Sequence, residues 1–377
     1  MAEPGRNAIG TWSGGRFLRY GETIDEDRLV ALLRPGKGID TVLTADTYGQ
    51  GEADGLLGRA LDGVPRESYS AIGAVGHDFY AGERDGPRGF PRFTDPKLRS
   101  PGGYADYLRM ATERSLERIG IDSFDLLLLH NPDRIGYGSE AVWDGMAALR
   151  EAGLATRIGI APGPANGFTL DLVACLERFG DRIDWAMIIL NPFEPWPGEL
   201  CLDAAARHGV KVLTRVVDYG GLFWGDLRAG MELAPGDHRA HRPDGWIEAG
   251  LAKLEQVLPI AERARLTPIQ LACQWNLAHP AVECVAPTLI QEAGEDACPI
   301  EAKRVELGSM PAEQRLSAED VAAIRAIGDN AGSMALKGAN PAHEGEERPD
   351  RWALDSELAA VGKRWGIDPG RDLVASG

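Results

Sequence analysis

The sequence predicts a (β/α)8 TIM barrel with long loops after its strands and a C-terminal extension. Three observations support this fold class. Apolar, β-branched runs alternate with segments of helical spacing along the 377 residues. Eight such runs are apolar almost throughout, as expected for parallel strands buried on both faces. No run leads directly into the Gly-x-Gly-x-x-Gly turn that an open dinucleotide-binding sheet requires.

The predicted strands are short and lie between turn residues. In chain order they are Asn7–Trp12, Thr41–Ala45, Ser70–Val75, Phe124–His130, Thr156–Ala161, Ala186–Asn191, Val210–Val217 and Val282–Pro287. Gly or Asp stands at many junctions, which is typical of helix ends. Amphipathic spacing predicts helices that include Tyr104–Ile119, Glu140–Ala152, Thr169–Phe179 and Pro268–Leu277.

Two long segments interrupt the alternation of strands and helices. Residues His77–Gly102 are rich in Arg, Pro and Gly, and residues Phe223–Trp246 contain the run Asp237-His-Arg-Ala-His-Arg242. Both follow strand ends. In a barrel, both therefore overhang the C-terminal face, where active sites form.

The predicted barrel occupies residues 1–333, and residues 334–377 form the C-terminal extension. The extension is polar and irregular until a last helical segment at Asp355–Trp365. We expect it to fold over the barrel mouth or to contact a neighbouring copy, in which case an oligomer would form through it.

The composition limits the partners that the protein can have. The 57 Asp and Glu residues exceed the 40 Lys and Arg residues, so the net charge of −17 repels nucleic acid and anionic lipid. No stretch reaches the roughly eighteen apolar residues of a membrane span. The 5 cysteines form no Cys-x-x-Cys pair, and most lie in apolar surroundings, as in reduced proteins. We therefore expect a cytoplasmic protein that acts on a small molecule.

Polar residues gather after the predicted strands, at the end of a barrel where pockets form. One such residue alone is explained as well by a loop or a helix cap, but about ten together indicate a site. The candidate catalytic residues are Asp46, Tyr48, His77 and His130. The candidate substrate-binding residues are Asp78, Asn131, Asn191, Glu194, Trp196, Arg215, Asp218 and Tyr219.

Two long segments resemble signatures of the aldo-keto reductase superfamily. The segment that begins Leu43-Thr-Ala-Asp46-Thr-Tyr48-Gly resembles its Asp-Thr-Ala-x-x-Tyr-Gly signature. Residues 113–133, which end Asp-Leu-Leu-Leu-Leu-His130-Asn-Pro-Asp, resemble its Asp-Leu-x-x-x-His-x-Pro-Asp signature. The resemblance covers about residues 7–330, and it implies a (β/α)8 barrel.

The resemblance also implies hydride transfer between a nicotinamide cofactor and a carbonyl compound. In the family a tyrosine donates the proton, a lysine and an aspartate tune it, and a histidine orients the substrate oxygen. Position by position, the resemblance assigns these roles to Asp46, Tyr48 and His130. The lysine position holds Ala74. Without an ammonium nearby a tyrosine is a weaker acid, and we expect His77 to substitute in part.

The cofactor positions depart from the family pattern as well. Ala161-Pro162 stands where the family has a Ser-Asn pair for the carboxamide, and Met187 replaces a glutamine. The loop that grips phosphates in the family reads Pro287-Thr288-Leu-Ile-Gln-Glu292 and carries no cation. The resemblance thus implies NAD(P) in a weakened site, with Pro287 and Thr288 as candidate cofactor-binding residues and without specificity for NADP.

Three functional hypotheses follow. The first is an NAD(P)-linked oxidoreductase that acts on a sugar, a polyol or another hydroxy or carbonyl compound. The second is a lyase, dehydratase or isomerase without this cofactor, in which Asp46, Tyr48, His77 and His130 transfer protons. The third is a binding barrel without catalysis, against which the many polar strand ends argue.

A metal-assisted variant of the second hypothesis is also open. Nitrogen and oxygen ligands are available from His77, Asp78, His130, Glu194, His238 and His241. Their spacing matches no specific metal motif, so the sequence assigns no metal site.

Overall fold

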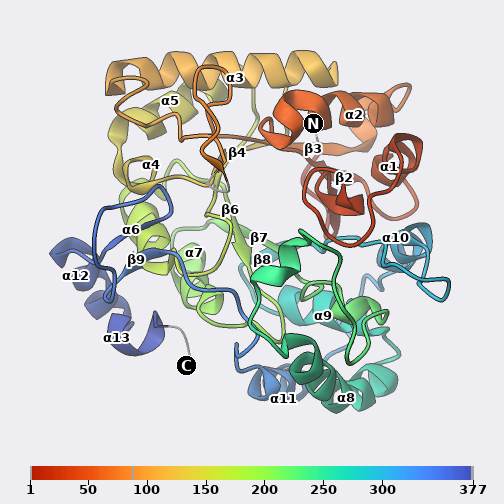
Figure 1. The fold of residues 1–377 in the computed structure, drawn as a ribbon. Helices are drawn as coiled ribbons and strands as arrows, with labels where there is room; N and C mark the ends of the chain where they lie inside the picture. Colours follow the sequence, from red (N-terminus) through yellow and green to blue (C-terminus); the bar gives the residue numbers. More distant parts are fainter. Residues whose placement is uncertain (1, 87–88, 375–377) are drawn as a thin grey trace.

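The computed structural model describes residues 2–86 and 89–374, and it forms a (β/α)8 barrel (Figure 1). Eight parallel strands follow one another around the sheet in chain order. The strands are β1 (Ala8–Gly10), β2 (Thr41–Leu43), β3 (Ser70–Val75), β4 (Leu126–His130), β5 (Ile158–Ala161), β6 (Trp185–Ile189), β7 (Lys211–Arg215) and β8 (Val282–Ala286).

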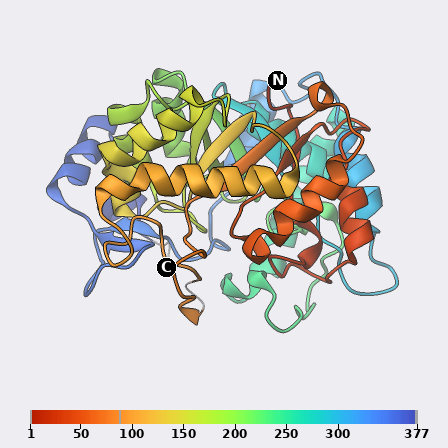
Figure 2. The same cartoon turned by 90° about the horizontal axis from the view of Figure 1, so that it is seen from above.

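The helices cover the outside of the barrel and the ends of its strands. They are α1 (Glu26–Leu33), α2 (Glu52–Leu61), α3 (Tyr104–Ile119), α4 (Arg134–Gly138), α5 (Glu140–Glu151), α6 (Thr169–Phe179), α7 (Leu202–Arg207), α8 (Trp246–Ala264), α9 (Pro268–Leu277), α10 (Ile300–Gly308), α11 (Ala318–Ile327), α12 (Ser356–Trp365) and α13 (Pro369–Asp372). From above, α3 runs across the flank of the barrel beside α2 and α5 (Figure 2).

The barrel closes between its first and last strands. Asn7, just before β1, bridges in parallel to Val285 of β8, and the Val285 amide donates to the carbonyl of Arg6 over 3.0 Å. The ring of strands therefore leaves no long unpaired edge, which is the liability that closed barrels avoid.

Alternation along the strands divides the apolar residues into two groups, because successive side chains point to opposite faces. One group packs against the helices. The other contains no helix residue and fills the barrel interior; it consists of Ala8, Trp12, Leu43, Ala45, Ile72, Ala74, Leu126, Leu128, Ala161, Trp185, Met187, Leu213, Cys284 and Ala286. The interior is thus packed with apolar side chains, and polar chemistry is confined to the C-terminal rim.

Helix α3 illustrates how the sequence sets the outer layer. Its buried residues include Tyr104, Leu108, Ala111, Ser115 and Ile119, spaced three or four apart so that they share one face. Gly120 ends the helix in the left-handed conformation at φ 78°, and its amide donates to Leu116.

The long segments after β3 and β7 both lie at the C-terminal rim, as the sequence predicts. The first folds back on itself, because His77 bridges to Arg92. The second carries a short 3-10 turn at His238–His241 and then leads into α8.

The C-terminal extension packs on the barrel beside α6. It contributes a two-stranded parallel sheet, β9 (Gly338–Asn340) and β10 (Arg351–Ala353), and helix α12. The Trp352 side chain is buried, and its Nε1 donates to Asp171 of α6 over 2.9 Å. The extension therefore belongs to the same core as the barrel.

Four cysteines are buried, Cys298 is half-buried, and all are unpaired. Within residues 2–86 and 89–374, no helix combines the length and the apolar character needed to cross a membrane.

Candidate active site

Three side chains from neighbouring strand ends meet at the C-terminal rim. The rings of Tyr48 and His130 lie edge to face with centroids 5.8 Å apart, and the ring of His77 lies 5.2 Å from that of His130. Tyr48 lies five residues beyond the end of β2 and begins a tight 3-10 turn in which Gly49 and Gly51 take positive φ angles of 58° and 96°. Glycine tolerates these angles, so the turn can place the tyrosine over the barrel.

Both imidazoles are neutral at physiological pH. Burial, with the nearby cations Arg92 and Arg215, lowers the pKa of His130 to about 3. Burial, Arg92 and His130 lower the pKa of His77 well below its usual range. Among residues 2–86 and 89–374, Nδ1 of His130 has no hydrogen-bond partner. A neutral imidazole can offer one N–H or one lone pair to a substrate.

The first insertion fixes His77 in place. Arg92 Nη1 lies 2.9 Å from Nδ1 of His77, and its Nε donates to the carbonyl of Asn131. The Asn131 amide lies 3.2 Å from Nε2 of His77. Nδ1 of His77 also lies 3.2 Å from the carbonyl of Phe90, so it sits between a guanidinium that can only donate and a carbonyl that can only accept. His77 is thus held on both sides, while His130 keeps a free nitrogen.

Asp46, which the sequence also predicts as a catalytic residue, makes no hydrogen bond to these rings. Leu43 and Ala45 point into the barrel, so Asp46, at the next alternate position, points outward. Its carboxyl is fully buried without a hydrogen-bond partner, and burial together with Asp54 raises its pKa well above the usual range.

The spacing of the signature also gives a second position for its aspartate. Aligned on Tyr48, its aspartate falls five residues earlier, at Leu43. Leu43 and Ala74 lie on the interior faces of the adjacent strands β2 and β3. The family's aspartate and lysine are therefore both absent, and two apolar residues stand in their places.

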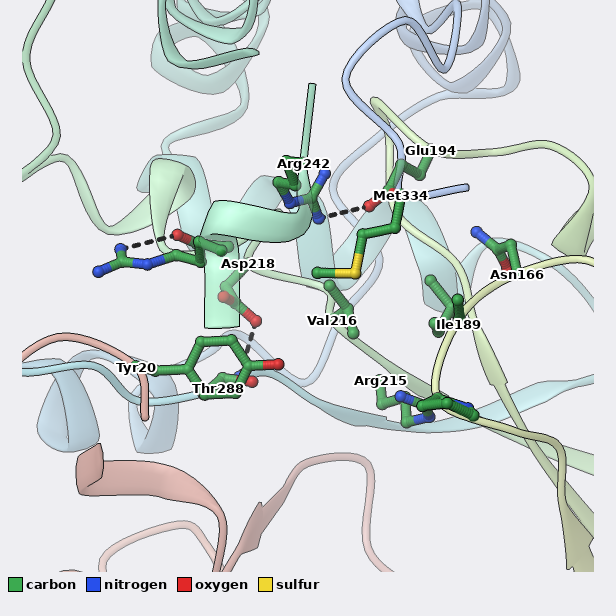
Figure 3. A pocket seen from close by; sticks show the side chains of 14 residues that line it. Tyr20, Asn166, Ile189, Glu194, Arg215, Val216, Asp218, Arg242, Thr288 and Met334 are labelled. Atoms are coloured by element: carbon green, nitrogen blue, oxygen red, sulfur yellow. Dashed lines mark hydrogen bonds and ion pairs between the residues drawn. The ribbon is translucent and has the colours of Figure 1, made fainter. Parts of the chain in front are cut away.

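A pocket lies beside this centre, with an empty volume of about 500 Å³ (Figure 3). Arg215, at the end of β7, links the two: it lines the pocket, and its charge opposes the rise that burial causes in the pKa of Tyr48. The pocket is lined by Tyr20, Pro164, Ala165, Asn166, Ile189, Glu194, Arg215, Val216, Asp218, Gly220, Arg239, Arg242, Thr288 and Met334.

Buried ion pairs form the wall of this pocket. Arg239 Nη2 lies 2.8 Å from Asp237 Oδ2 and 3.0 Å from Glu292 Oε2. Arg242 Nη2 lies 2.8 Å from Glu194 Oε2, and its guanidinium stacks over the Tyr219 ring at 4.4 Å. These charges satisfy one another and hold the second insertion against the barrel.

Several residues that the sequence places in the substrate site are structural. Asp78 is fully buried, pairs with Arg99 and caps the turn that follows it. Asn191 is fully buried, and its side chain bonds the backbone amide of Glu194. Tyr219 is fully buried beneath Trp246. All three had the strand-end position that predicts a site, but their polar groups face the protein interior.

Other predicted residues lie nearer the pocket. Glu194, Arg215, Asp218 and Thr288 line it. Trp196 is half-buried, with its amide 3.4 Å from Asn330 Oδ1, outside the lining. Pro287 precedes Thr288 at the end of β8.

Sequence reasoning missed Tyr20, Asn166, Arg239, Arg242 and Met334 as pocket residues. The two arginines lie in an insertion that the sequence places at the rim, which is a signal that could have found them. The others lie in irregular loops, whose residues carry no periodic pattern.

Metal ligands do not converge in the described part of the chain. Within residues 2–86 and 89–374, no group of three or more His, Cys, Asp or Glu side chains is arranged to hold a metal ion. The rings of His238 and His241 lie edge to face with centroids 5.3 Å apart, and Tyr20 packs against His238.

A nicotinamide dinucleotide, which the fold implies, fits this structure at one end only. The pocket beside this centre offers the aromatic ring of Tyr20, the apolar side chain of Ile189 and the amide of Asn166, which suit an aromatic carboxamide. In the loop after β8, Glu292 is bound to Arg239, and the Thr288 amide and carbonyl are taken by Asp218 and Trp224. An added 2′-phosphate would meet a carboxylate there.

Comparison with known proteins agrees with the fold. The aldo/keto reductase family model matches residues 8–294. A 6-dehydroglucose reductase of Novosphingobium aromaticivorans is 25% identical over 285 residues, which cover 72% of this chain and 78% of that protein. A 6-dehydroglucose reductase of Agrobacterium fabrum is 28% identical over 160 residues, 42% of this chain and 50% of that protein.

Solved structures share the barrel. An aldo-keto reductase of Bacillus halodurans in its holo form superposes with a TM-score of 0.62 at 22% identity, covering 87% of this chain and 93% of that one. The glycerol dehydrogenase of Gluconobacter oxydans gives 0.65 at 21% identity, with 85% and 90% covered. With most of the barrel matched by the family model, the chain belongs to the aldo/keto reductase family of oxidoreductases.

Proposed function

We propose that the protein is an NAD(P)-linked oxidoreductase that interconverts a carbonyl and a hydroxyl group on a sugar or polyol. The observation that carries this proposal is the edge-to-face contact of Tyr48 and His130 beside a pocket at the barrel rim. The names of relatives support the substrate class, since two are 6-dehydroglucose reductases and a structural neighbour is a glycerol dehydrogenase.

Tyr48 and His130 have different roles at the reacting oxygen. Burial raises the pKa of Tyr48, so at neutral pH its hydroxyl carries a proton that it can give to a carbonyl oxygen. The neutral His130 donates or accepts one hydrogen bond at the same oxygen and orients it. His77, held by Arg92 and Asn131, closes the far side of the group.

The dinucleotide supplies the hydride when it is bound. Tyr20, Asn166 and Ile189 would hold its ring end. Because Glu292 occupies the loop after β8, the proposal includes a preference for NAD over NADP.

Tyr48→Phe tests the proton donor. We expect kcat/KM to fall by a factor on the order of 10² to 10⁴, because one positioned acid is removed. The measurement is NADH oxidation followed by absorbance over a panel of aldehydes and ketoses. Tyr104→Phe is the matched control, since its hydroxyl bonds only the Thr94 carbonyl at 3.3 Å. Equal loss in both variants would remove Tyr48 from the mechanism.

A second candidate function is proton transfer without a dinucleotide, in a lyase or isomerase. The observation that favours it is the replacement of the family's aspartate and lysine by Leu43 and Ala74 in the barrel interior. Two neutral imidazoles beside a neutral phenol remain sufficient for acid-base chemistry at a sugar carbon.

Ala74→Lys separates the two candidates. In a reductase, an ammonium near Tyr48 lowers the pKa of the phenol, and NADH oxidation at neutral pH should rise. In a lyase or isomerase, the same lysine would enter a site whose chemistry does not use an ammonium group. Native activity should then fall, and neither the variant nor the wild type should oxidise NADH.

A further inference from the structure

One half-buried arginine of the pocket, Arg215, has no carboxylate partner among the described residues. Among the ion pairs of residues 2–86 and 89–374, Arg239 pairs with two carboxylates and Arg242 with one. Arg215 takes part in none. A guanidinium that lines a pocket without a carboxylate partner has donors available for an anionic ligand.

The backbone holds Arg215 without neutralising it. Its Nη2 donates to the carbonyls of Pro162, at 3.2 Å, and of Gly163. Its Nε is buried and has no partner. Two carbonyls thus fix the direction of the side chain and leave donors of the guanidinium unused. Arg215 also lines a second cavity of about 310 Å³, so it stands where two cavities meet.

The acidic residues of the pocket are already engaged. Glu194 accepts from Arg242 at 2.8 Å and from Asn191 at 3.1 Å. Asp218 accepts from the amides of Thr288 at 2.7 Å and Gly221 at 2.8 Å, as Figure 3 shows for Thr288. Neither carboxylate bonds Arg215, and neither is free to turn towards it.

A buried guanidinium lies on the other side of the catalytic centre. Arg92 also takes part in no ion pair of the described residues, and it bonds His77 and two backbone carbonyls. With both imidazoles neutral, the centre between Arg92 and Arg215 carries positive charge in a protein whose net charge is −17.

We propose that the substrate of this site is an oxyanionic sugar, and that Arg215 binds its carboxylate or phosphate group beside Tyr48 and His130. A charged oxygen on the substrate would be the anionic partner that Arg215 lacks in the described chain. This inference rests on the proposed function, and it narrows the substrate from sugars and polyols in general to acidic ones.

Equilibrium binding tests the inference without turnover. The probes are glucuronate, glucose 6-phosphate and glucose, titrated by calorimetry into the wild type, Arg215→Gln and Arg215→Lys. Arg109→Gln, at a half-exposed arginine of α3 paired with Glu113, is the matched control. A separate titration with NADH reports on the dinucleotide.

We expect the wild type to bind one of the two acidic sugars more tightly than glucose. Arg215→Gln should weaken that binding on the order of ten- to a hundredfold, the value of a charge-assisted hydrogen bond, and leave glucose unaffected. Arg215→Lys should recover part of the loss, and Arg109→Gln should cause none. The acidic sugar that responds identifies the group as carboxylate or phosphate.

The inference is overturned if the wild type prefers neither acid to glucose, or if Arg215→Gln weakens glucose and acid equally. It is also overturned if the variant loses NADH binding alone, because the anion would then be a cofactor phosphate. Its failure is distinct from that of the proposed function. NADH oxidation with a neutral aldehyde and no acid preference would reject only the inference, and acid binding without NADH oxidation would reject only the oxidoreductase.

Discussion

Leu43 and Ala74 mark the point where this chain departs most from the chemistry its family implies. Both lie on the interior face of neighbouring strands, at the positions of an aspartate and a lysine. An ion pair buried in a barrel can be exchanged for apolar side chains with little loss of stability, but losing one partner alone is costly. In this chain both positions are apolar, so neither leaves a buried charge without a partner.

A double-mutant cycle at these positions tests this pairing. Ala74→Lys alone should lose roughly 3 kcal/mol of unfolding free energy, because its ammonium is buried against Leu43 without a partner. Leu43→Asp alone should also be destabilising. The double variant should recover at least 1 kcal/mol relative to the sum of the single changes. Urea unfolding monitored by tryptophan fluorescence gives all four values, and strict additivity would show that the two sites do not meet.

At the scale of elements, sequence patterns set the bounds of helices better than those of strands. Helices α3, α6 and α9 begin and end where the periodicity predicts, and the capping box of Thr267 with Gln270 fixes the start of α9. Strands β2 and β7 are shorter than their apolar runs, since residues beyond the ladder bend into rim loops. The strands β9 and β10 have only three residues each, too few for a pattern.

The same alternation that identifies a strand also decides which of its residues reach the site. Asp46 carries a carboxyl group just beyond a strand, as a site residue would. The alternation of side chains along the chain nevertheless turns it outward, because Leu43 and Ala45 face the barrel interior. Tyr48 and His130 are predicted from sequence because each stands at or just beyond the end of a predicted strand. Tyr20 and Met334 are not, since only the tertiary fold brings their loops to the pocket.

Docking of the extension on α6 depends on one buried carboxyl. Asp171 is buried and accepts from Trp352 Nε1 at 2.9 Å and from the Ala339 amide at 3.1 Å. Burial raises its pKa from 3.8 to about 6. Since the folded chain holds this proton more tightly than the unfolded chain, the stabilisation is complete below the unfolded value and is lost as the pH rises through 6.

Between pH 5 and 7.5, this group should therefore lower the stability of the wild type as the pH rises. Asp171→Asn should flatten that part of the profile by roughly 1 to 2 kcal/mol. Asp203→Asn, at an exposed position of α7, should leave the profile unchanged. The test is the urea midpoint of each protein across this range; an Asp171→Asn profile parallel to that of the wild type would assign the pH dependence to other groups.

On the scale of the whole molecule, long-range and local charge oppose each other. The chain carries −17 overall, whereas the centre between Arg92 and Arg215 is positive. An anionic ligand is therefore repelled at a distance and held at close range. Salt screens the distant charges within about 10 Å at 0.1 M, and it weakens a buried contact much less.

The association rate of glucuronate should consequently rise as ionic strength increases from roughly 10 to 150 mM. The rate for glucose should stay constant, because it carries no charge. Stopped-flow tryptophan fluorescence measures both. A rate for glucuronate that falls with salt would mean that the local positive field extends beyond the rim and dominates the approach.

Met334 reaches the pocket from a segment that begins forty residues after the family match ends at residue 294. The proposed proton donor thus lies inside the family match, whereas part of the pocket wall lies in the C-terminal extension outside it. Exchanging the tail between relatives would then be a route to altered selectivity that leaves the reacting groups untouched. In such chimaeras, the parent of the barrel would set the chemistry and the parent of the tail would bias the choice of substrate.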